Sequence, residues 1–313
     1  MQPLVQTWLL ATILLVNLSL NCVAATPPSL PQFRVAGYLP DYRAGSVDLG
    51  GLQGVTDVIL FSAEITASGG VATEAMDAFP WAALRQWKAR TGSRLWLAVG
   101  GWGKSRHFAA ISKDLELRKR FVEAVVKLCS DRGLDGVDLD WEHPSGALEE
   151  QAYGELIAAL RSVLHPLRLQ VSVTIAGWQR LTRQAIDSVD VVQLMAYDRP
   201  GVHASYDGAV EDVQKLLKLG VPAGKLVLGL PFYGRHRTDR NRTLTYREIE
   251  DRHRPAADVD EVDGVAFNGP TTLLRKVGFA KELGLAGVMI WELGQDATGE
   301  RALLRTVTAA AAR

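Results

Sequence analysis

The chain has few cysteines, no surplus of charge and no run of basic residues. Only two of its 313 residues are cysteine, so a disulfide scaffold is excluded and the hydrophobic core must hold the fold. The 35 basic and 35 acidic residues cancel, which excludes the positive surface that nucleic-acid binding requires. The six histidines lack the spacing of metal ligands. We therefore expect a neutral partner, no nucleic acid, no metal and no cofactor.

The N-terminus also lacks charge, and the first charged side chain is Arg34. Trp8 to Leu20 form a mostly apolar block of 13 residues, which is shorter than the ~20 residues needed to span a bilayer. The small residues around Ala24 and Ala25 are typical of a signal-peptide cleavage site. We expect a secreted or periplasmic protein, although the absence of Lys and Arg before Trp8 leaves an uncleaved anchor open. The predicted segments are a signal peptide at 1–25, a Pro-rich linker at 26–32 and one folded domain at 33–313.

Short apolar runs alternate with amphipathic stretches through the predicted domain. Near-continuous apolar strands that alternate with helices are typical of a parallel sheet covered on both faces. Eight such units within 281 residues predict a closed (β/α)8 TIM barrel. The expected strands are 33–38, 57–61, 94–101, 136–142, 169–175, 189–197, 225–231 and 286–291, and the clearest helices are 115–131, 149–164, 210–219 and 271–283. The polar connection 236–268 is predicted to be a rim loop with one short helix at 246–251.

Four carboxylates fall within the eight residues DGVDLDWE at 135–142, in the fourth predicted strand. Strand alternation places Asp138, Asp140 and Glu142 on one face and apolar residues, including Trp141, on the other. A carboxylate removed from water costs several kcal/mol unless it is paired or protonated. A solvated edge strand is the alternative, but the apolar opposite face disfavours it. We interpret this face as a functional site. Asp135 falls on the opposite face of the strand, and we assign it to a turn or to the start of the strand.

Active sites of such barrels lie at the carboxyl ends of the strands. Glu142 is therefore expected at the mouth, with Asp140 and Asp138 successively deeper. Other polar and aromatic residues at or near predicted strand ends are Tyr38, Gly101, Trp102, Gln193, Met195, Tyr197, Asp198, Phe232, Tyr233 and Trp291. These residues are expected to share one rim.

The chain resembles the family 18 glycoside hydrolases, the chitinase family, from about Phe33 to Asp296. The segment 135–142 is similar to the family's D-x-x-D-x-D-x-E motif. A lone D-x-D-x-E would be weak support, whereas several motifs in the family's order are specific. The supporting motifs are VGGW at 99–102, QLMAYD at 193–198, GLPFYGR at 229–235 and GVMIWE at 287–292.

The resemblance implies a retaining hydrolase of β-1,4-linked N-acetylglucosamine in chitin or related glycans, with 33–313 as its catalytic domain. Glu142 is implied as the general acid and Asp140 as the group that orients the 2-acetamido group, while Asp138 shares a proton with Asp140. The acetamido oxygen itself would attack the anomeric carbon and give an oxazolinium intermediate. Tyr197 would donate a hydrogen bond to that oxygen. The pKa of Glu142 should be raised by burial and by the Asp140 charge.

The resemblance also implies a set of substrate-binding residues on a monomeric protein. Trp291 would form the floor beneath the sugar at the cleavage site. From the residues alone, Trp291 and Met195 could instead belong to the core, and Trp178, a further subsite candidate, could cap a helix. The full set is Tyr38, Gly101, Trp102, Met195, Asp198, Tyr233, Arg235 and Trp291.

Two departures from the family pattern carry consequences. Ala98 stands where the family usually has Ser, so Asp138 loses one hydroxyl partner and is left with Tyr38, which predicts a shifted pH optimum. The segment 236–268 is too short for the α+β subdomain that walls a deep groove in many members, so a more open cleft is expected. Related activities on N-glycan cores or peptidoglycan-type chains stay open. A non-hydrolytic chitin-binding lectin is the rival class, although such proteins typically lose the acid that Glu142 supplies.

Overall fold

The computed structural model describes residues 33–313. The predicted signal peptide (1–25) and linker (26–32) lie outside the described residues. Within 33–313, no helix combines the length and the apolar character that a membrane span requires.

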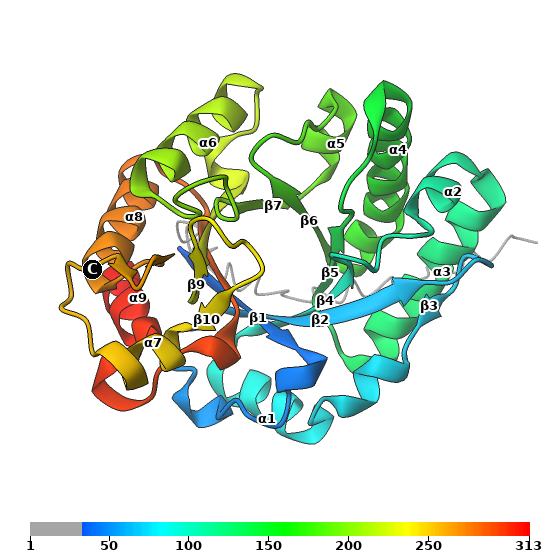
Figure 1. The fold of residues 1–313 in the computed structure, drawn as a ribbon. Coiled ribbons are helices and arrows are strands. Elements are labelled where there is room, and N and C mark those ends of the chain that lie inside the picture. Colours follow the sequence, from blue (N-terminus) through cyan, green and yellow to red (C-terminus); the bar gives the residue numbers. More distant parts are fainter. Residues whose placement is uncertain (1–32) are drawn as a thin grey trace, which may run out of the picture. The chain divides into compact units, whose positions relative to one another are not determined.

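Eight parallel strands form a closed barrel, which Figure 1 shows with helices arranged around it. The strands follow one another in the order β1-β13-β8-β7-β6-β5-β4-β2, and β1 pairs with β2 to complete the ring. The predicted TIM barrel is therefore confirmed. The barrel strands are β1 (Arg34–Pro40), β2 (Asp57–Ile65), β4 (Arg94–Gly100), β5 (Gly136–Asp140), β6 (Gln170–Ala176), β7 (Val191–Met195), β8 (Leu226–Pro231) and β13 (Gly287–Trp291).

The helices cover the outside of the barrel. Between β1 and β2 the described chain forms only the short 3-10 turns Asp41–Arg43 and Leu49–Gly51, and the two-residue strand β3 (Val71–Ala72) extends the sheet beside β2. The predicted helices match α3, α4, α6 and α8. The helices are α1 (Trp81–Thr91), α2 (Phe108–Lys113), α3 (Leu115–Arg132), α4 (Gly146–Leu164), α5 (Arg183–Ser188), α6 (Tyr206–Lys218), α7 (Tyr246–His253), α8 (Pro270–Glu282) and α9 (Leu303–Ala312).

Helix α3 illustrates how the sequence sets these elements. The Asp114 carboxylate accepts hydrogen bonds from the backbone N–H groups of residues 116 and 117, which have no partner within the helix. Gly133 ends the helix with φ 67°, a conformation that glycine adopts at little cost. The buried face carries Phe121 and Val125, which belong to the same core as Val137 of β5. The main core therefore lies between the barrel and its helices.

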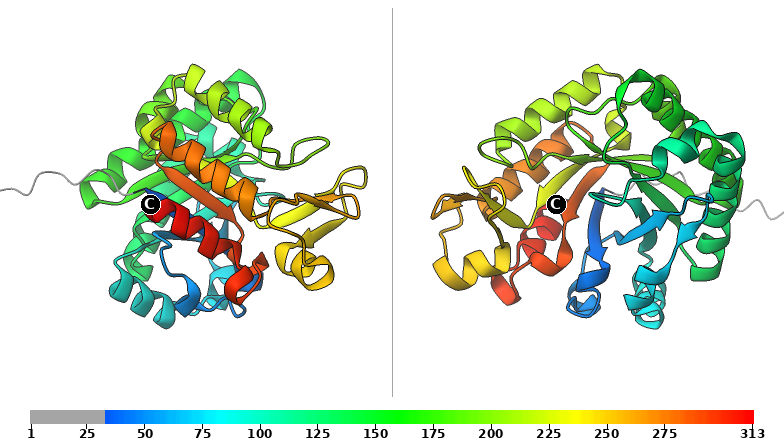
Figure 2. Two further views of the ribbon diagram at one scale, coloured as in Figure 1. Left: turned by 90° about the vertical axis from the view of Figure 1, so that its left-hand side faces the viewer. Right: turned by 45° about the vertical axis from the view of Figure 1, so that its right-hand side comes forward.

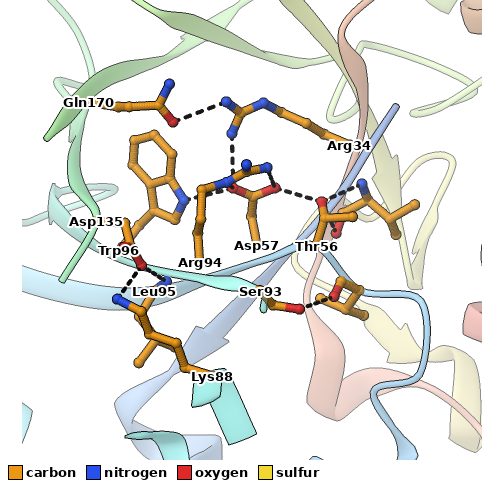
Figure 3. A network of polar contacts seen from close by, with 12 residues as sticks. Arg34, Thr56, Asp57, Lys88, Ser93, Arg94, Leu95, Trp96, Asp135 and Gln170 are labelled. Carbon is orange, nitrogen blue, oxygen red and sulfur yellow. Dashed lines mark hydrogen bonds and ion pairs between the residues drawn. The ribbon is translucent and has the colours of Figure 1, made fainter. Parts of the chain in front are cut away.

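A polar cluster, drawn in Figure 3, closes the barrel at the amino ends of the strands. The carboxylate of Asp57, 1% exposed, lies at its centre. It accepts hydrogen bonds from Arg34 (2.8 Å), Arg94 (2.5 and 2.8 Å) and the indole of Trp96 (2.8 Å). Arg34 also donates to Gln170 at 3.0 Å. Through these ion pairs and hydrogen bonds, the cluster ties β1, β2, β4 and β6 together.

Asp135 lies beside this cluster in Figure 3. Its carboxylate accepts a hydrogen bond from the backbone N–H of Leu95 at 2.8 Å and pairs with Lys88 at 2.7 Å. Asp135 thus fixes the start of β5 against β4, and its predicted strand-start role is confirmed.

The insertion after β8 is more regular than the sequence predicted. The helix expected at 246–251 is present as α7, which begins at the Thr245–Glu248 capping box. The rest is a four-stranded antiparallel sheet and not a simple loop, with the order β10-β9-β12-β11. Figure 2 shows this yellow-to-orange unit projecting beyond the barrel. Its strands are β9 (Tyr233–His236), β10 (Thr243–Thr245), β11 (Glu261–Val262) and β12 (Val265–Ala266).

Candidate active site

A cavity of about 1110 Å³ lies at the carboxyl ends of the barrel strands. It is lined by nine of the twelve residues that the sequence nominated: Tyr38, Trp102, Asp140, Glu142, Met195, Tyr197, Asp198, Arg235 and Trp291. Trp178 also lines the cavity. The other three, Gly101, Asp138 and Tyr233, are buried and do not line it.

The carboxylates lie in the order that strand alternation predicted. Asp138 is fully buried, Asp140 is 3% exposed, and Glu142 faces the cavity with its side chain 13% exposed. Strand β5 ends at Asp140, two residues earlier than predicted, because the backbone N–H of Glu142 donates to the hydroxyl of Ser105 at 3.0 Å and not to a neighbouring strand. On the opposite face, Trp141 is 3% exposed in the outer core.

Asp138 has more support than the sequence predicted. Its Oδ2 atom accepts hydrogen bonds from Tyr38, as expected, and from Thr174 of β6, each at 2.8 Å. Ala98 lies beside Asp138 in the β4–β5 register and offers no hydroxyl. The expectation that Tyr38 would be left as the remaining partner was therefore wrong, since the adjoining strand β6 supplies a second hydroxyl.

Two glycines allow β4 and β5 to approach closely at the mouth. Gly100 and Gly101 have φ of 102° and 101°, which L side chains rarely adopt. A Cβ atom at Gly100 would lie 2.3 Å from the Asp140 carbonyl oxygen, and one at Gly101 would lie 2.3 Å from the ring of Phe61. Gly101 also donates its N–H to the Asp140 carbonyl oxygen at 2.7 Å. Gly101 thus shapes the strand end that carries the acids.

The surroundings of Asp140 and Glu142 favour their protonated forms. Burial raises the pKa of Asp140 well above its usual value, and the charges of Glu142 and Asp138 raise it further. Burial raises the pKa of Glu142 to about 7, and the charge of Asp198 adds to this. The predicted raised pKa of Glu142 and its cause in burial are confirmed, and Asp198 is a further charge that the sequence did not name. Because the repulsion between two like charges is mutual, Glu142 and Asp140 each favour the protonated form of the other.

Asp198 supplies a fixed negative charge on the cavity wall. Although burial opposes its ionisation, hydrogen bonds and the positive charge of Arg235 hold the pKa of Asp198 at about 2. The Arg235 guanidinium donates to it at 2.7 Å. Arg240, which the sequence did not nominate, donates to the backbone carbonyl of Asp198 at 2.8 Å. Tyr233 lies behind this wall, with its ring centroid 6.2 Å from that of Tyr197.

Aromatic rings form the base and edges of the cavity. Trp291 contacts Phe61 edge-on, with ring centroids 4.7 Å apart, and Tyr38, with centroids 5.5 Å apart. Trp102 and Trp178 are 81% and 61% exposed at the rim. A helix-capping role for Trp178 is excluded, because Thr182 caps α5. Trp291 and Met195 both line the cavity and also pack on the barrel-interior cluster, so neither is a pure core residue.

Several lining residues escaped sequence reasoning. Most lie in loops, where no periodicity marks a side chain's direction. His143 is the most notable of them, because its Nε2 lies 3.5 Å from the Glu142 carboxylate. Its position in the sequence, directly after Glu142, could have identified it as a neighbour of the acid. The missed residues are Asp41, Tyr42, Phe61, Lys104, His143, Thr174, Ala176, Arg240 and Asn241.

This arrangement suits acid catalysis on a neutral ligand with flat apolar faces. A carboxylic acid with a pKa of about 7 keeps much of its proton near neutral pH and can donate it to a leaving oxygen. The described residues contain no group of three or more His, Cys, Asp or Glu side chains that could hold a metal ion.

Comparisons with known proteins agree with this geometry. "Chitinase 1" of Aphanocladium album is 27% identical over 277 residues, which cover 70% of this chain and 66% of that protein, so the chain spans about two thirds of its relative. A chitinase structure from Flavobacterium johnsoniae has a TM-score of 0.80 and 25% identity and covers 90% of this chain and 94% of that one. A Bacteroides thetaiotaomicron chitinase structure shares the fold, with a TM-score of 0.82, 23% identity and coverage of 89% and 96%. The model of the glycosyl hydrolases family 18 matches residues 34–296, and the chain belongs to that family.

Proposed function

We propose that the protein hydrolyses β-1,4-linked N-acetylglucosamine polymers or oligomers with retention of configuration, as a chitinase. The observation that carries this proposal is the position of Glu142, which faces a cavity that Asp140 and Trp291 also line, with burial raising its pKa to about 7. The acid that non-hydrolytic relatives typically lose is thus present and has a pKa suited to donating a proton. Hydrolysis is therefore favoured over a lectin function.

In the proposed mechanism, the acetamido oxygen of the substrate attacks the anomeric carbon while the glycosidic C–O bond breaks. Glu142 gives its proton to the leaving oxygen and then, as a carboxylate, takes a proton from the water that opens the oxazolinium ring. The configuration is retained because the anomeric carbon is attacked twice.

Asp140 and Tyr197 are proposed to act on the acetamido group. Oδ1 of Asp140 is buried without a hydrogen-bond partner and can accept the acetamido N–H. Among the described residues, the Tyr197 hydroxyl donates its hydrogen bond to the sulfur of Met289, a weak acceptor at 3.9 Å, and it can donate instead to the acetamido oxygen. Asp138 and Asp140 can hold one proton between them. Asp140 can then carry a negative charge when the positive oxazolinium develops.

The shape of the rim supports endo cleavage. The unit made of β9 to β12 and α7 is small, and Figure 2 shows it on one side of the molecule. A polymer can then lie across the mouth instead of entering it by one end. The substrate chain is proposed to pass the exposed rings of Trp102 and Trp178.

A glucosaminidase acting on peptidoglycan-type chains is the second candidate. It is favoured by the basic side chains of Lys104, Arg235 and Arg240, all of which line the cavity. Within the described chain, Arg240 donates only to the backbone carbonyls of Asp198 and Arg199 and has no carboxylate partner. Such a group could receive the lactyl carboxylate of a muramic acid residue.

One panel of substrates tests these proposals. The purified protein is offered chitohexaose, a high-mannose glycopeptide and peptidoglycan, and NMR reads the anomer of the fresh product. We expect turnover of chitohexaose with initial β product. Initial α product would contradict the mechanism, and turnover of peptidoglycan alone would favour the second candidate.

We also propose that the protein is exported as a monomer. The apolar block Trp8–Leu20 and the small residues before Thr26 support export. Mass spectrometry of the protein from the exporting cells would locate the cleavage, and an intact N-terminus would favour an anchor. Sedimentation would give the oligomeric state, and a stable dimer would contradict the monomer.

A further inference from the structure

Three oxygen atoms meet at the bottom of the cavity, which Tyr38 and Thr174 both line. The Tyr38 hydroxyl and the Thr174 hydroxyl each lie 2.8 Å from Oδ2 of Asp138, and they lie 2.6 Å from each other. All three side chains are at most 2% exposed. Within this triangle, every oxygen is within hydrogen-bond distance of the other two.

A count of protons shows what the triangle can do. When Asp138 is ionised, both hydroxyls can donate to Oδ2. When Asp138 is protonated on Oδ2, it can donate a hydrogen bond to the Thr174 hydroxyl. The Thr174 hydroxyl then donates to the Tyr38 hydroxyl, and the Tyr38 hydroxyl donates back to Oδ2 of Asp138. Each contact then holds one proton. The Thr174 hydroxyl satisfies both states by rotating, which an apolar side chain of the same shape cannot do.

The position of Thr174 relates this triangle to the departure at Ala98. Strands β4 and β6 flank β5, so residues on either strand can reach Asp138. Ala98 lies directly beside Asp138 on β4, has no hydroxyl and is fully buried. The hydroxyl that is missing on one side of Asp138 is thus present on the other.

We propose that Thr174 is a positioning residue that supports Asp138 from β6, on the side of β5 opposite to Ala98, which has no hydroxyl to offer. This inference rests on the proposed function, because Asp138 serves catalysis there through the proton it shares with Asp140. Burial raises the pKa of Asp138, and the hydroxyls of Ser172, Thr174 and Tyr38 offset part of that increase. Without Thr174, the pKa of Asp138 should rise.

Ser172 lies on the same strand as Thr174 and acts on the same carboxylate, so it cannot serve as a neutral control. It lies opposite Asp138 in the β5–β6 register and is fully buried. Its hydroxyl lowers the pKa of Asp138 together with those of Thr174 and Tyr38, although its contact with the carboxylate is less well aligned than theirs. Thr272 provides the matched control, because its hydroxyl also donates to a carboxylate, that of Asp260 at 2.5 Å, and neither residue lines the cavity.

The kinetic test uses chitohexaose and a small set of variants. We expect Thr174→Val, which keeps the shape, to lower kcat by about tenfold or more with KM within about twofold, since one hydrogen bond to a charged group is lost. Thr174→Ser should recover most of the activity. Ala98→Ser should restore the Thr174→Val enzyme to within about threefold of wild type and have little effect alone. The control Thr272→Val should stay within about threefold of wild type.

A second measurement separates this inference from the proposed function. The ¹³C carboxyl resonance of Asp138 is titrated by NMR in wild type, Thr174→Val and the Ala98→Ser double variant. We expect the apparent pKa of Asp138 to rise in the valine variant and to fall again in the double variant. An unchanged titration, or folded Thr174→Val enzyme that Ala98→Ser fails to restore, would overturn the inference. A wild-type protein that does not hydrolyse chitohexaose would contradict the proposed function but not the role of Thr174, because the titration of Asp138 requires no turnover.

Discussion

Nε2 of His143 lies 3.5 Å from Oε2 of Glu142, so a second titratable group directly faces the proposed acid. The other ring nitrogen, Nδ1, lies 3.0 Å from Oε1 of Gln179. That oxygen also accepts the backbone N–H of Ala176 at 3.4 Å, which identifies it as the acceptor. Nδ1 therefore carries the hydrogen, and burial lowers the pKa of His143. A neutral ring presents a lone pair to Glu142 and favours the protonated acid.

Loss of the acid should remove turnover without removing binding. Glu142→Gln keeps the size and polarity of the side chain but has no proton to donate. We expect kcat to fall by about 10³-fold, within the usual range for a general acid. Affinity for chitohexaose, measured calorimetrically, should stay within about threefold. Substantial residual turnover would mean that another group protonates the leaving oxygen.

The activity should decline on the alkaline side near neutrality. Glu142 must be protonated to act, and its pKa is raised to about 7, first by burial and next by the Asp198 charge. The value of kcat/KM should therefore fall tenfold per pH unit once the pH exceeds about 7. A pH profile on a soluble oligosaccharide checks this, and a profile that is flat from pH 6 to 9 would contradict it.

Removal of the Asp198 charge should shift that decline to lower pH. Asp198, with a pKa of about 2, is ionised wherever the enzyme works and disfavours the carboxylate form of Glu142. In Asp198→Asn the pKa of Glu142 falls, so the profile should move toward acid. In the control Arg235→Gln, Asp198 stays ionised but its negative charge is no longer offset by the guanidinium. The pKa of Glu142 should then rise, and the decline in activity should move to higher pH. Equal shifts in both variants would indicate a rearranged wall rather than a charge effect.

Breaking the cluster at the barrel's closed end should cost stability. Asp57→Asn leaves Arg34 and Arg94 without their anion, and loss of one partner from a buried ion pair costs about 3 kcal/mol in the free energy of unfolding. Denaturant unfolding measures this. Asp131→Asn, which breaks the exposed pair with Lys127, is the control and should cost under about 1 kcal/mol.

The stability difference between wild type and Asp57→Asn should also depend on pH. Burial alone would raise the pKa of Asp57, but Arg94 and Arg34 lower it below its usual value. Because the folded pKa is the lower one, the stabilisation is complete above the unfolded pKa of about 3.9 and is lost as the pH falls through the folded pKa. The difference in the free energy of unfolding between wild type and Asp57→Asn should therefore become smaller at acidic pH. A constant gap down to pH 2 would contradict the charge pairing.

The exposed tryptophans should matter for binding and little for chemistry. Trp102→Ala and Trp178→Ala remove rings that are 81% and 61% exposed at the cavity rim. We expect KM for chitohexaose to rise about tenfold in one or both, with kcat within about threefold, since stacking on a sugar is lost. Leu148→Ala, at an exposed apolar residue outside the cavity lining, should leave KM unchanged. Wild-type KM in both tryptophan variants would place the substrate elsewhere.

The sequence predicted the barrel and the order of the acids because both depend on short periods along one strand. Asp138 and Asp140 share a face through an alternation of two residues. Thr174 could not be predicted in this way, since its contact depends on the register between β5 and β6. His143 was missed because it follows the end of β5 in a loop. The sheet of β9 to β12 escaped notice because its strands are only two to four residues long.

The cluster around Asp57 bears on which parts of this protein can accept substitutions during evolution. It binds the strands at one end of the barrel through groups that none of the cavity residues share. Loops at the other end can therefore vary in length and composition without loosening the scaffold. Laboratory evolution aimed at new glycans should tolerate substitutions at Trp102, Lys104 and Arg240 far better than substitutions at Asp57.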